Sequence, residues 1–201
     1  MFYIFDLDGT LAQSKSGKEF SNSVEDQELI PGVLEKLTEV READPNAQFL
    51  IASNQGGVAF GHLTIEEADA MCQKALTDIN GSLSVFCPEH PEGTVVPYNV
   101  PSQYRKPSPG MLLYLIAELD ADPEAVVYIG DMDTDELAAT AAGVAFEWAD
   151  DFFGRETVAV LDETEIEADA QADAARDAIA AEEPEASVRI ERIRGDGKDG
   201  E

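Results

Sequence analysis

The stretch YIFDLDGTL, residues 3–11, decides how the rest of the chain is interpreted. Its start, Tyr3 to Phe5, is typical of a buried strand, because aromatic and β-branched residues favour strands. Side chains alternate along a strand, so Asp6 and Asp8 are expected to leave the same face. Two carboxylates about 4 Å apart repel by roughly 4 kcal/mol at an effective dielectric constant near 20. The pattern therefore predicts a cation, a shared proton or open water beside them; the alternative is two solvated aspartates at a strand end.

Segments with strand-like and helix-like spacing alternate along the chain. After the first strand we expect strands at residues 47–54, 82–87, 125–131, 144–148 and 157–161, and helices at residues 33–42, 64–79, 109–120 and 135–143. Thr64 followed by Glu67 is typical of a capping box at the start of the second helix. This alternation predicts an α/β fold in which helices cover both faces of a mostly parallel sheet.

Polar residues gather where the expected strands end. They are Asp6 and Asp8 after the first strand, Ser53 and Asn54 after the second, Asp131, Asp133 and Asp135 after the fourth, and Arg105 and Lys106 just before a helix. In parallel sheets, ligand sites lie beyond the carboxyl ends of the strands. Four segments that are far apart in the sequence are therefore expected to meet at one surface.

These segments resemble the four motifs of the haloacid dehalogenase (HAD) superfamily. The motifs are DLDGT at residues 6–10, SNQ at residues 53–55, KPSPGM at residues 106–111 and GDMDTD at residues 130–135. They occur in the superfamily's order, and the resemblance covers about residues 1–150. It implies a Rossmann-like three-layer core, bound Mg²⁺, and phosphoryl transfer through an aspartyl-phosphate.

The resemblance also implies catalytic roles for individual residues. A carboxylate can attack phosphorus and split hydrolysis into two steps, and Asp6 matches that nucleophile. Asp8 matches the group that protonates the leaving alkoxide and then deprotonates the attacking water. Ser53 and Lys106 match the two donors that surround the transferring phosphoryl group. The backbone amides that follow Asp6 and Asn54 are expected to assist them.

A metal site is expected among the same carboxylates. Mg²⁺ prefers a few carboxylates, a phosphate oxygen and several retained waters. The resemblance implies that Asp6 and Asp131 bind it through their side chains and Asp8 through its backbone carbonyl. Asp135, one helical turn after Asp131, is expected to hold a metal-bound water or the lysine. Asp133 fits none of these roles and is expected to be solvated.

The substrate is expected to be a small phosphorylated metabolite. Residues 12–30 and 56–105 are too few to form a separate cap domain, so the site is expected to be open. The segments IASNQGGVAFG, CPEHPEG and RKPSPGM look most like those of the histidinol-phosphate and heptose-bisphosphate phosphatases. Asn54 and Arg105 are the expected substrate-binding residues, with Arg105 able to hold a second anionic group.

The chain departs from that group at two places. Where the group's loop usually binds zinc, this chain has Cys87, Glu89, Ser102 and Tyr104. One thiolate cannot complete a tetrahedral site, so we expect no structural zinc. The group commonly carries an arginine where Phe60 stands here.

Composition narrows the function further. The 201 residues include 42 acidic and 13 basic side chains, giving a formal charge of −29. Such a surface repels nucleic acid and anionic membranes, and it is typical of proteins from salt-loving organisms. No apolar run is long enough to span a membrane, and no secretory signal is evident. With only two cysteines, without paired spacing, a reduced cytoplasmic protein is expected.

Three other functions remain open from the sequence. A related uncapped branch of the superfamily removes 3′-phosphates from nucleic acid ends, although the basic groove that this would need is not visible. The fold could also serve a non-catalytic binding protein. A phosphotransferase would use the same intermediate as a hydrolase.

The end of the chain differs in kind from the rest. We expect a phosphatase core over residues 1–162 and an acidic tail over residues 163–201. The tail begins with an alanine- and acid-rich segment typical of a solvated helix. SVRIERIR, residues 187–194, alternates apolar and charged residues like an edge strand, and the last residues are expected to be disordered.

Overall fold

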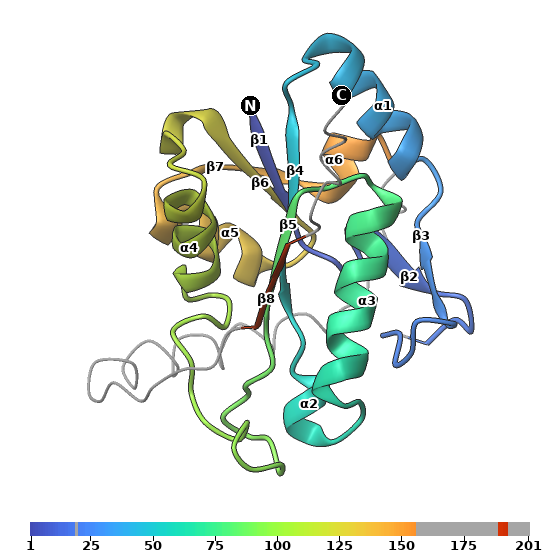
Figure 1. Ribbon diagram of the computed structural model, residues 1–201, viewed down its shortest axis with the longest axis vertical. Helices are drawn as coiled ribbons and strands as arrows, with labels where there is room; N and C mark the ends of the chain where they lie inside the picture. The colour runs from blue at the N-terminus through green and yellow to red at the C-terminus, as the bar shows by residue number, and fades with distance from the viewer. Residues whose placement is uncertain (19, 156–188, 193–201) are drawn as a thin grey trace, which may run out of the picture.

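A twisted sheet forms the centre of the molecule (Figure 1). The computed structural model describes residues 1–18, 20–155 and 189–192. Within them the strand order is β7-β6-β1-β4-β5-β8. The parallel strands are β1 (Phe2–Phe5), β4 (Gln48–Asn54), β5 (Leu83–Cys87), β6 (Val126–Gly130) and β7 (Ala145–Trp148), and β8 (Arg189–Arg192) runs antiparallel to β5. The expected mostly parallel sheet is confirmed.

Strand β1 lies where the order of the strands reverses. Tyr3 pairs with Phe49 of β4 on one side and with Val127 of β6 on the other. Later strands extend the sheet outward in both directions from β1. Such a reversal opens a crevice beyond the carboxyl ends of the central strands, which is where open α/β sheets bind ligands.

Helices cover both faces of the sheet (Figure 1). On one face lie α1 (Val33–Ala43), α3 (Ile65–Asp78) and α6 (Ala149–Phe153), and on the other lie α4 (Gly110–Glu118) and α5 (Asp133–Ala142). The expected capping box opens α3, where Thr64 and Glu67 each bond the other's backbone N–H. The result is the three-layer arrangement expected from the alternating pattern.

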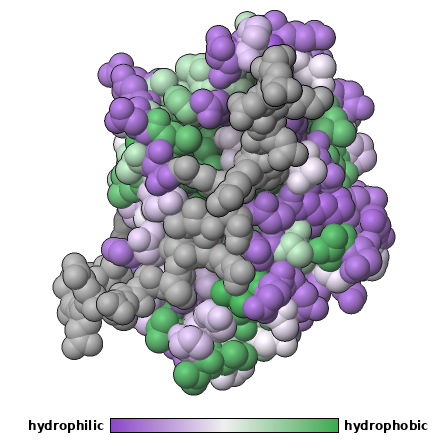
Figure 2. Space-filling model, in the orientation of Figure 1, coloured by the Kyte–Doolittle hydropathy of each residue, from purple (hydrophilic) through white to green (hydrophobic). Residues whose placement is uncertain are grey.

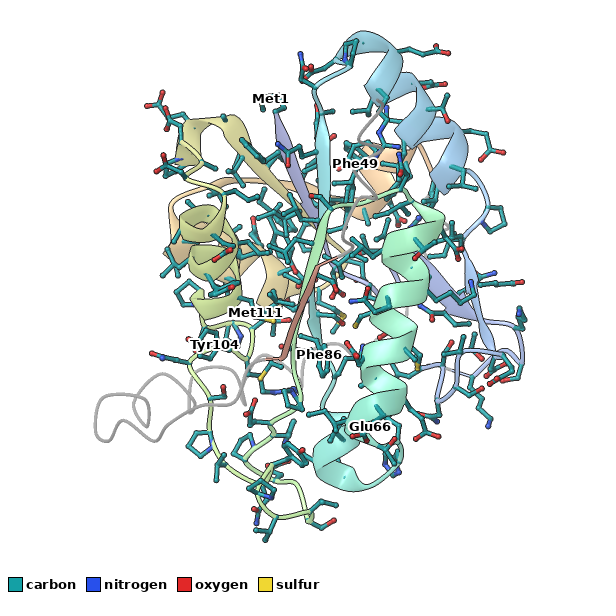
Figure 3. All side chains as sticks on the ribbon, viewed as in Figure 1. Met1, Phe49, Glu66, Phe86, Tyr104 and Met111 are labelled. Carbon is teal, nitrogen blue, oxygen red and sulfur yellow. The ribbon has the colours of Figure 1, made fainter. Side chains whose placement is uncertain are left out.

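Apolar side chains gather in two clusters, one on each face of the sheet. Phe49 belongs to the cluster beneath α1, α3 and α6, and Met111 to the cluster beneath α4 and α5 (Figure 3). Alternation divides β1 in the same way, with Phe5 in the first cluster and Ile4 in the second. Hydrophilic side chains cover much of the outer surface seen in Figure 2.

Several short elements were not expected from the sequence. Strands β2 (Ala12–Ser14) and β3 (Gln27–Leu29) form an antiparallel hairpin in a stretch that is mostly polar. Its tip is held by Asp26, whose carboxylate accepts hydrogen bonds from the hydroxyls of Ser14 and Ser16, both at 2.8 Å. The other unexpected elements are the one-turn helix α2 (Gly57–Phe60), a 3₁₀ turn (Pro123–Ala125) and α6.

No cap domain is present in the part of the chain that the structure describes. The hairpin occupies residues 12–29, and α2, α3, β5 and a long loop occupy residues 57–109. Strand β8 lies at the edge of the sheet, within the segment expected to form an edge strand. The strand expected at residues 157–161, the domain boundary and the rest of the acidic tail lie outside the described residues. Within the described residues, no helix is both long and apolar enough to cross a membrane.

Candidate active site

Lys106 is the centre of a buried cluster at the carboxyl ends of the strands. Its side chain is only 3% exposed. The Nζ atom lies 2.6 Å from Asp6 Oδ1 and 2.7 Å from Asp135 Oδ1. It also contacts the Tyr128 hydroxyl at 2.9 Å and the Ala52 carbonyl at 3.3 Å. Three of the four motif segments therefore meet directly at one ammonium group.

The charges in this cluster do not balance. Burial alone would lower the pKa of Lys106, but the carboxylates of Asp6 and Asp135 raise it above its ordinary value. Burial raises the pKa of Asp6, and Asp135 adds to this effect while Lys106 opposes it. Burial and Asp135 likewise raise the pKa of Asp131. Asp6 and Asp135 thus contact one ammonium, with the exposed carboxylate of Asp131 near both, and a further cation would stabilise the ionised site.

The geometry of the carboxylates fits a hard metal ion. Asp6, Asp131 and Asp135 each place one oxygen within 4.8 Å of the others. These three side chains offer only oxygen donors, which suits Mg²⁺ better than a metal that prefers nitrogen or sulfur. Thr10 orients Asp131 by donating a hydrogen bond to its Oδ1 atom at 3.1 Å.

Asp135 is the least free of the three carboxylates. Its Oδ1 atom contacts Lys106 and accepts a hydrogen bond from Tyr128 at 2.9 Å, and its Oδ2 atom accepts from the backbone N–H of Met132 at 3.1 Å. Of its two expected roles, the geometry favours holding the lysine. Gly130 permits this arrangement, because a Cβ atom there would lie 2.4 Å from the Cβ of Asp135.

Asp8 faces a different partner. Its Oδ2 atom accepts a hydrogen bond at 3.0 Å from Gln55 Nε2, which also donates to Ser53 Oγ at 2.9 Å. Burial raises the pKa of Asp8 to about 6, although the bond from Gln55 and the charge of Lys106 lower it. A pKa near 6 suits a group that gives and takes a proton at neutral pH.

Asn54 differs from the expectation that it binds substrate. Its Nδ2 atom donates to the backbone carbonyl of Lys106 at 3.1 Å, and its Oδ1 atom accepts from the backbone N–H of Lys106 at 3.0 Å. Both ends of the amide therefore fix the loop that carries the lysine. The next backbone amide, that of Gln55, was expected to assist in holding the phosphoryl group. It donates instead to the Cys87 carbonyl at 2.8 Å and is not available for that role.

Arg105 lies beside the cluster, in the long loop. Its Nη1 atom donates to the Glu89 carbonyl at 3.3 Å and would lie 3.0 Å from a Cβ atom at Gly56. The neighbouring Cys87 thiol donates to Glu89 Oε2 at 3.1 Å, and burial together with Glu89 raises the pKa of this thiol to about 12. A cysteine that binds zinc does so as a thiolate, and the ion itself deprotonates it, so the thiol pKa does not decide the question. The absence of structural zinc stays a prediction that rests on the single cysteine among the four expected ligand positions.

Four residues that contact the candidate site or its first motif were given no role from the sequence. Thr10 and Gln55 stand inside the DLDGT and SNQ motifs, but no role was given to them. Tyr128 had a signal, because a phenol in the middle of a buried strand needs a hydrogen-bond partner. Arg155, which donates to the carbonyls of Gly9 and Thr10, belongs to no motif.

Comparisons with known proteins show similarity to phosphatases. Residues 1–157 match the family model described as polynucleotide kinase 3 phosphatase. D-glycero-beta-D-manno-heptose-1,7-bisphosphate 7-phosphatase of Yersinia pestis is 31% identical over 144 residues, which are 69% of this chain and 74% of the relative. The enzyme of the same name from Escherichia coli K12 is 29% identical over 144 residues, or 69% of this chain and 73% of the relative.

A solved structure gives the same result. The D,D-heptose 1,7-bisphosphate phosphatase of B. bronchiseptica, complexed with magnesium and phosphate, superimposes with a TM-score of 0.59 and 28% identity, covering 72% of this chain and 78% of that one. Its fold, together with the family match over more than three quarters of the chain, agrees with the motifs and the carboxylate cluster. The chain therefore belongs to the polynucleotide kinase 3 phosphatase family and is a phosphatase of the HAD superfamily, in the group of the heptose-bisphosphate phosphatases.

Proposed function

We propose that this phosphatase hydrolyses a small phosphorylated metabolite, of the sugar-phosphate or histidinol-phosphate type, with Mg²⁺ and through an aspartyl-phosphate on Asp6. The observation that carries the proposal is the buried cluster in which Lys106 bridges Asp6 and Asp135 beside Asp131. Two features support the substrate class: the relatives are named for a sugar bisphosphate, and the site has no cap domain in the described residues.

In the first step, an oxygen of the Asp6 carboxylate attacks phosphorus, and the bond between phosphorus and the leaving oxygen breaks. Asp8 gives its proton to that oxygen, so the product leaves as an alcohol. In the second step, Asp8 takes a proton from water as the water attacks phosphorus, and Asp6 is released with inorganic phosphate. The pKa of Asp8, about 6, lets it serve in both directions.

Other groups hold the phosphoryl oxygens. Lys106 supplies positive charge, and Asp135 and Tyr128 keep its ammonium in place. Ser53 supplies a hydroxyl whose position is set by Gln55. Mg²⁺, held by Asp6, Asp131 and the carbonyl of Asp8, would neutralise charge on the phosphoryl oxygens.

A panel of substrates tests the proposal. Phosphate release should be compared for a heptose 1,7-bisphosphate, a hexose monophosphate, histidinol phosphate and a 3′-phosphorylated oligonucleotide, each with Mg²⁺. We expect the highest kcat/KM for a small metabolite. The oligonucleotide is the second candidate, because the matching family model is named for that activity. Efficient release from the oligonucleotide, above every small metabolite, would overturn the proposed substrate class.

The cations near the site favour the small metabolite. Binding of nucleic acid normally needs several Lys or Arg side chains on the phosphate backbone. Between residues 56 and 110 the sequence has only Lys74, Arg105 and Lys106. Lys106 is buried in the cluster, and Lys74 pairs with Asp78 along α3. Of these three cations, Arg105 is the one that is left for a second anionic group.

Replacing Arg105 by alanine should weaken recognition of the natural substrate far more than the chemistry. A charge-assisted hydrogen bond contributes about 1.5–3 kcal/mol, so kcat/KM for a bisphosphate should fall by about 10- to 150-fold. For 4-nitrophenyl phosphate, which has no second anion, we expect a change of less than about threefold. Steady-state kinetics with both substrates make the measurement.

The matched control is Lys74→Ala, which removes a cation from α3 and should leave both rates unchanged. Because Arg105 also bonds the Glu89 carbonyl, the melting temperature of each variant should be measured as well. An equal loss with both substrates would show that Arg105 supports the fold of the site and does not recognise the substrate.

We further propose that the protein is adapted to high salt and works in the cytoplasm. A formal charge of −29 on 201 residues makes the folded chain repel itself when screening is weak. The screening length falls from about 10 Å at 0.1 M salt to about 3 Å at 1 M. We expect the melting temperature to rise by several degrees between these concentrations of KCl, measured with and without saturating Mg²⁺. A flat or falling melting temperature would remove the high-salt proposal.

A further inference from the structure

Arg155 holds the turn of the first motif from outside the four motifs. Its Nη1 atom donates to the Gly9 carbonyl at 3.1 Å, and its Nη2 atom donates to the Thr10 carbonyl at 2.6 Å. One planar guanidinium thus bridges two successive peptide groups that lie 146 and 145 residues away in the sequence. A fork of this geometry is specific to arginine, because a lysine presents a single point charge.

Arg155 is itself held firmly. It follows α6, which ends at Gly154 in the left-handed conformation, with φ of 65°. The backbone N–H of Arg155 donates to the Asp150 carbonyl at 2.8 Å, and its guanidinium lies 4.5 Å from the centre of the Phe153 ring. Helix α6 is anchored in turn by Phe152, which is 5% exposed and packs on Phe5 of β1.

The turn that Arg155 holds leads directly to a proposed metal ligand. Thr10 is fully buried, and its hydroxyl donates to Asp131 Oδ1 at 3.1 Å. Gly9 has a φ of +78°, and a Cβ atom there would lie only 2.1 Å from Asp131 Oδ2. The turn therefore packs against the Asp131 carboxylate with little free space, and a shift of its carbonyls would move the hydroxyl that orients Asp131.

The guanidinium of Arg155 makes its polar contacts mainly with this turn. Its nearest carboxylate among the described residues, Asp150, is half exposed and lies 3.9 Å away, beyond hydrogen-bond distance. Its Nε atom is buried without a hydrogen-bond partner in the described residues. The two carbonyls are thus its principal polar contacts.

We propose that Arg155 is a positioning residue for the metal site, which sets the Gly9–Thr10 turn so that Thr10 holds Asp131 in the orientation that binds Mg²⁺. This inference rests on the proposed function, because it takes the carboxylate cluster to be a Mg²⁺ site. Neighbours that orient metal ligands typically contribute 10- to 100-fold to metal affinity, and we assign an effect of about that size to Arg155.

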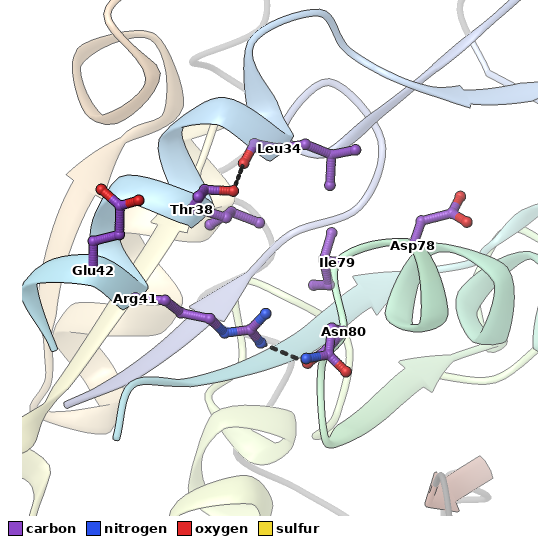
Figure 4. Close-up of a pocket in the computed structure, with 8 residues that line it drawn as sticks. Leu34, Thr38, Arg41, Glu42, Asp78, Ile79 and Asn80 are labelled. Carbon is purple, nitrogen blue, oxygen red and sulfur yellow. Dashed lines mark hydrogen bonds between the residues drawn. The ribbon is translucent and has the colours of Figure 1, made fainter. Parts of the chain in front are cut away.

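The chain offers a matched control in Arg41. Its guanidinium lies 4.3 Å from the centre of the Phe49 ring, and its Nη2 atom donates to the Asn80 carbonyl at 2.6 Å (Figure 4). Arg41 therefore makes the same two kinds of contact as Arg155. It lines a cavity of about 260 Å³ between α1 and the end of α3, none of whose lining residues belongs to the active site.

The test is a titration of the protein with Mg²⁺ alone. The melting temperature is the readout, so the titration needs no substrate. The wild type, Arg155→Ala, Arg155→Lys, Arg41→Ala and Asp131→Asn should be compared in 1 M KCl, which screens diffuse binding of Mg²⁺ to the acidic surface. The same variants should then be assayed for the Mg²⁺ concentration that gives half-maximal activity.

We expect the Mg²⁺ midpoint to rise by about 10- to 100-fold in Arg155→Ala and to stay within twofold of the wild type in Arg41→Ala. Arg155→Lys should also shift the midpoint, because one ammonium cannot reproduce the fork, and it carries the test if the alanine variant does not fold. A midpoint within twofold of the wild type in either Arg155 variant would overturn the inference. If instead the wild type shows no Mg²⁺-dependent stabilisation, or Asp131→Asn retains it, the proposed metal site itself is wrong.

Discussion

Replacing Asp6 by asparagine should abolish turnover and leave the fold intact. Loss of the nucleophile from an enzyme that works through a covalent intermediate lowers kcat by on the order of 10⁶-fold, and an amide cannot take over the attack on phosphorus. The amide has nearly the shape of the carboxylate and can still accept a hydrogen bond from Lys106, which lies 2.6 Å from Asp6 Oδ1. Initial rates with 4-nitrophenyl phosphate at saturating Mg²⁺ measure the effect.

The matched control for this variant is Asp133→Asn. Asp133 is exposed at the start of α5, two residues after Asp131, and should tolerate the change with an unaltered rate. Acid quenching with labelled substrate should trap a labile phosphoryl group on the wild type and none on Asp6→Asn. Substantial activity in Asp6→Asn, with mass spectrometry excluding deamidation, would mean that another group attacks phosphorus.

The sheet and the place of the site could be predicted from local patterns. Alternation along a strand requires that Asp6 and Asp8 share a face, and parallel strands bring their carboxyl ends to one edge. Those two rules are enough to bring Ser53 and Asp131 towards Asp6 without any knowledge of distances. Lys106 lies in the long loop between β5 and α4, and its place was implied by the order of the motifs. The alternation of strands and helices predicts an α/β fold with a parallel sheet, and the resemblance to the HAD superfamily implies the Rossmann-like three-layer form of it.

The partners of the individual side chains could not be predicted in this way. Asn54 bonds the backbone of Lys106, which is 52 residues away, and both groups look equally suited to a phosphate in the sequence. Gln55 joins Ser53 to Asp8 only because β1 and β4 are neighbours in register. These contacts depend on the exact fit of loops from different strands, which no local pattern encodes.

The contacts of Arg155 could not be predicted from a local pattern either. Arg155 directly follows the short helix α6, which was not predicted, because five residues rich in aromatic and acidic side chains have no helical period. The β2–β3 hairpin was missed for a related reason: its strands have three residues each, and hydrogen bonds from serine hydroxyls to Asp26 hold its tip. Both elements are defined by tertiary contacts.

After the loss of the nucleophile, removal of Mg²⁺ should have the next largest effect. It should lower both the activity and the stability of the protein. Stabilisation of phosphoryl charge by a metal contributes several kcal/mol to the transition state, so excess chelator should lower kcat by at least about 10³-fold, reversibly. Addition of Mg²⁺, and not of KCl at equal ionic strength, should restore the rate. Full activity in chelator would rule out the metal in catalysis.

The stability of the metal-free protein should depend on pH with a definite sign. Burial raises the pKa of Asp8 to about 6 and also raises the pKa of Asp6 and Asp131, against an ordinary value of 3.8 in each case. Above pH 3.8 the unfolded chain therefore loses protons that the folded chain still binds, and the free energy of unfolding falls as the pH rises through 6. The proposed Mg²⁺ would bind the ionised carboxylates and compete with these protons. In 1 M KCl, which screens the general surface charge, the rise in melting temperature on adding Mg²⁺ should be small at pH 5 and should grow towards pH 7.5. Equal shifts at both pH values would contradict the raised pKa values, because carboxylates that held extra protons at pH 5 would bind the metal more weakly there.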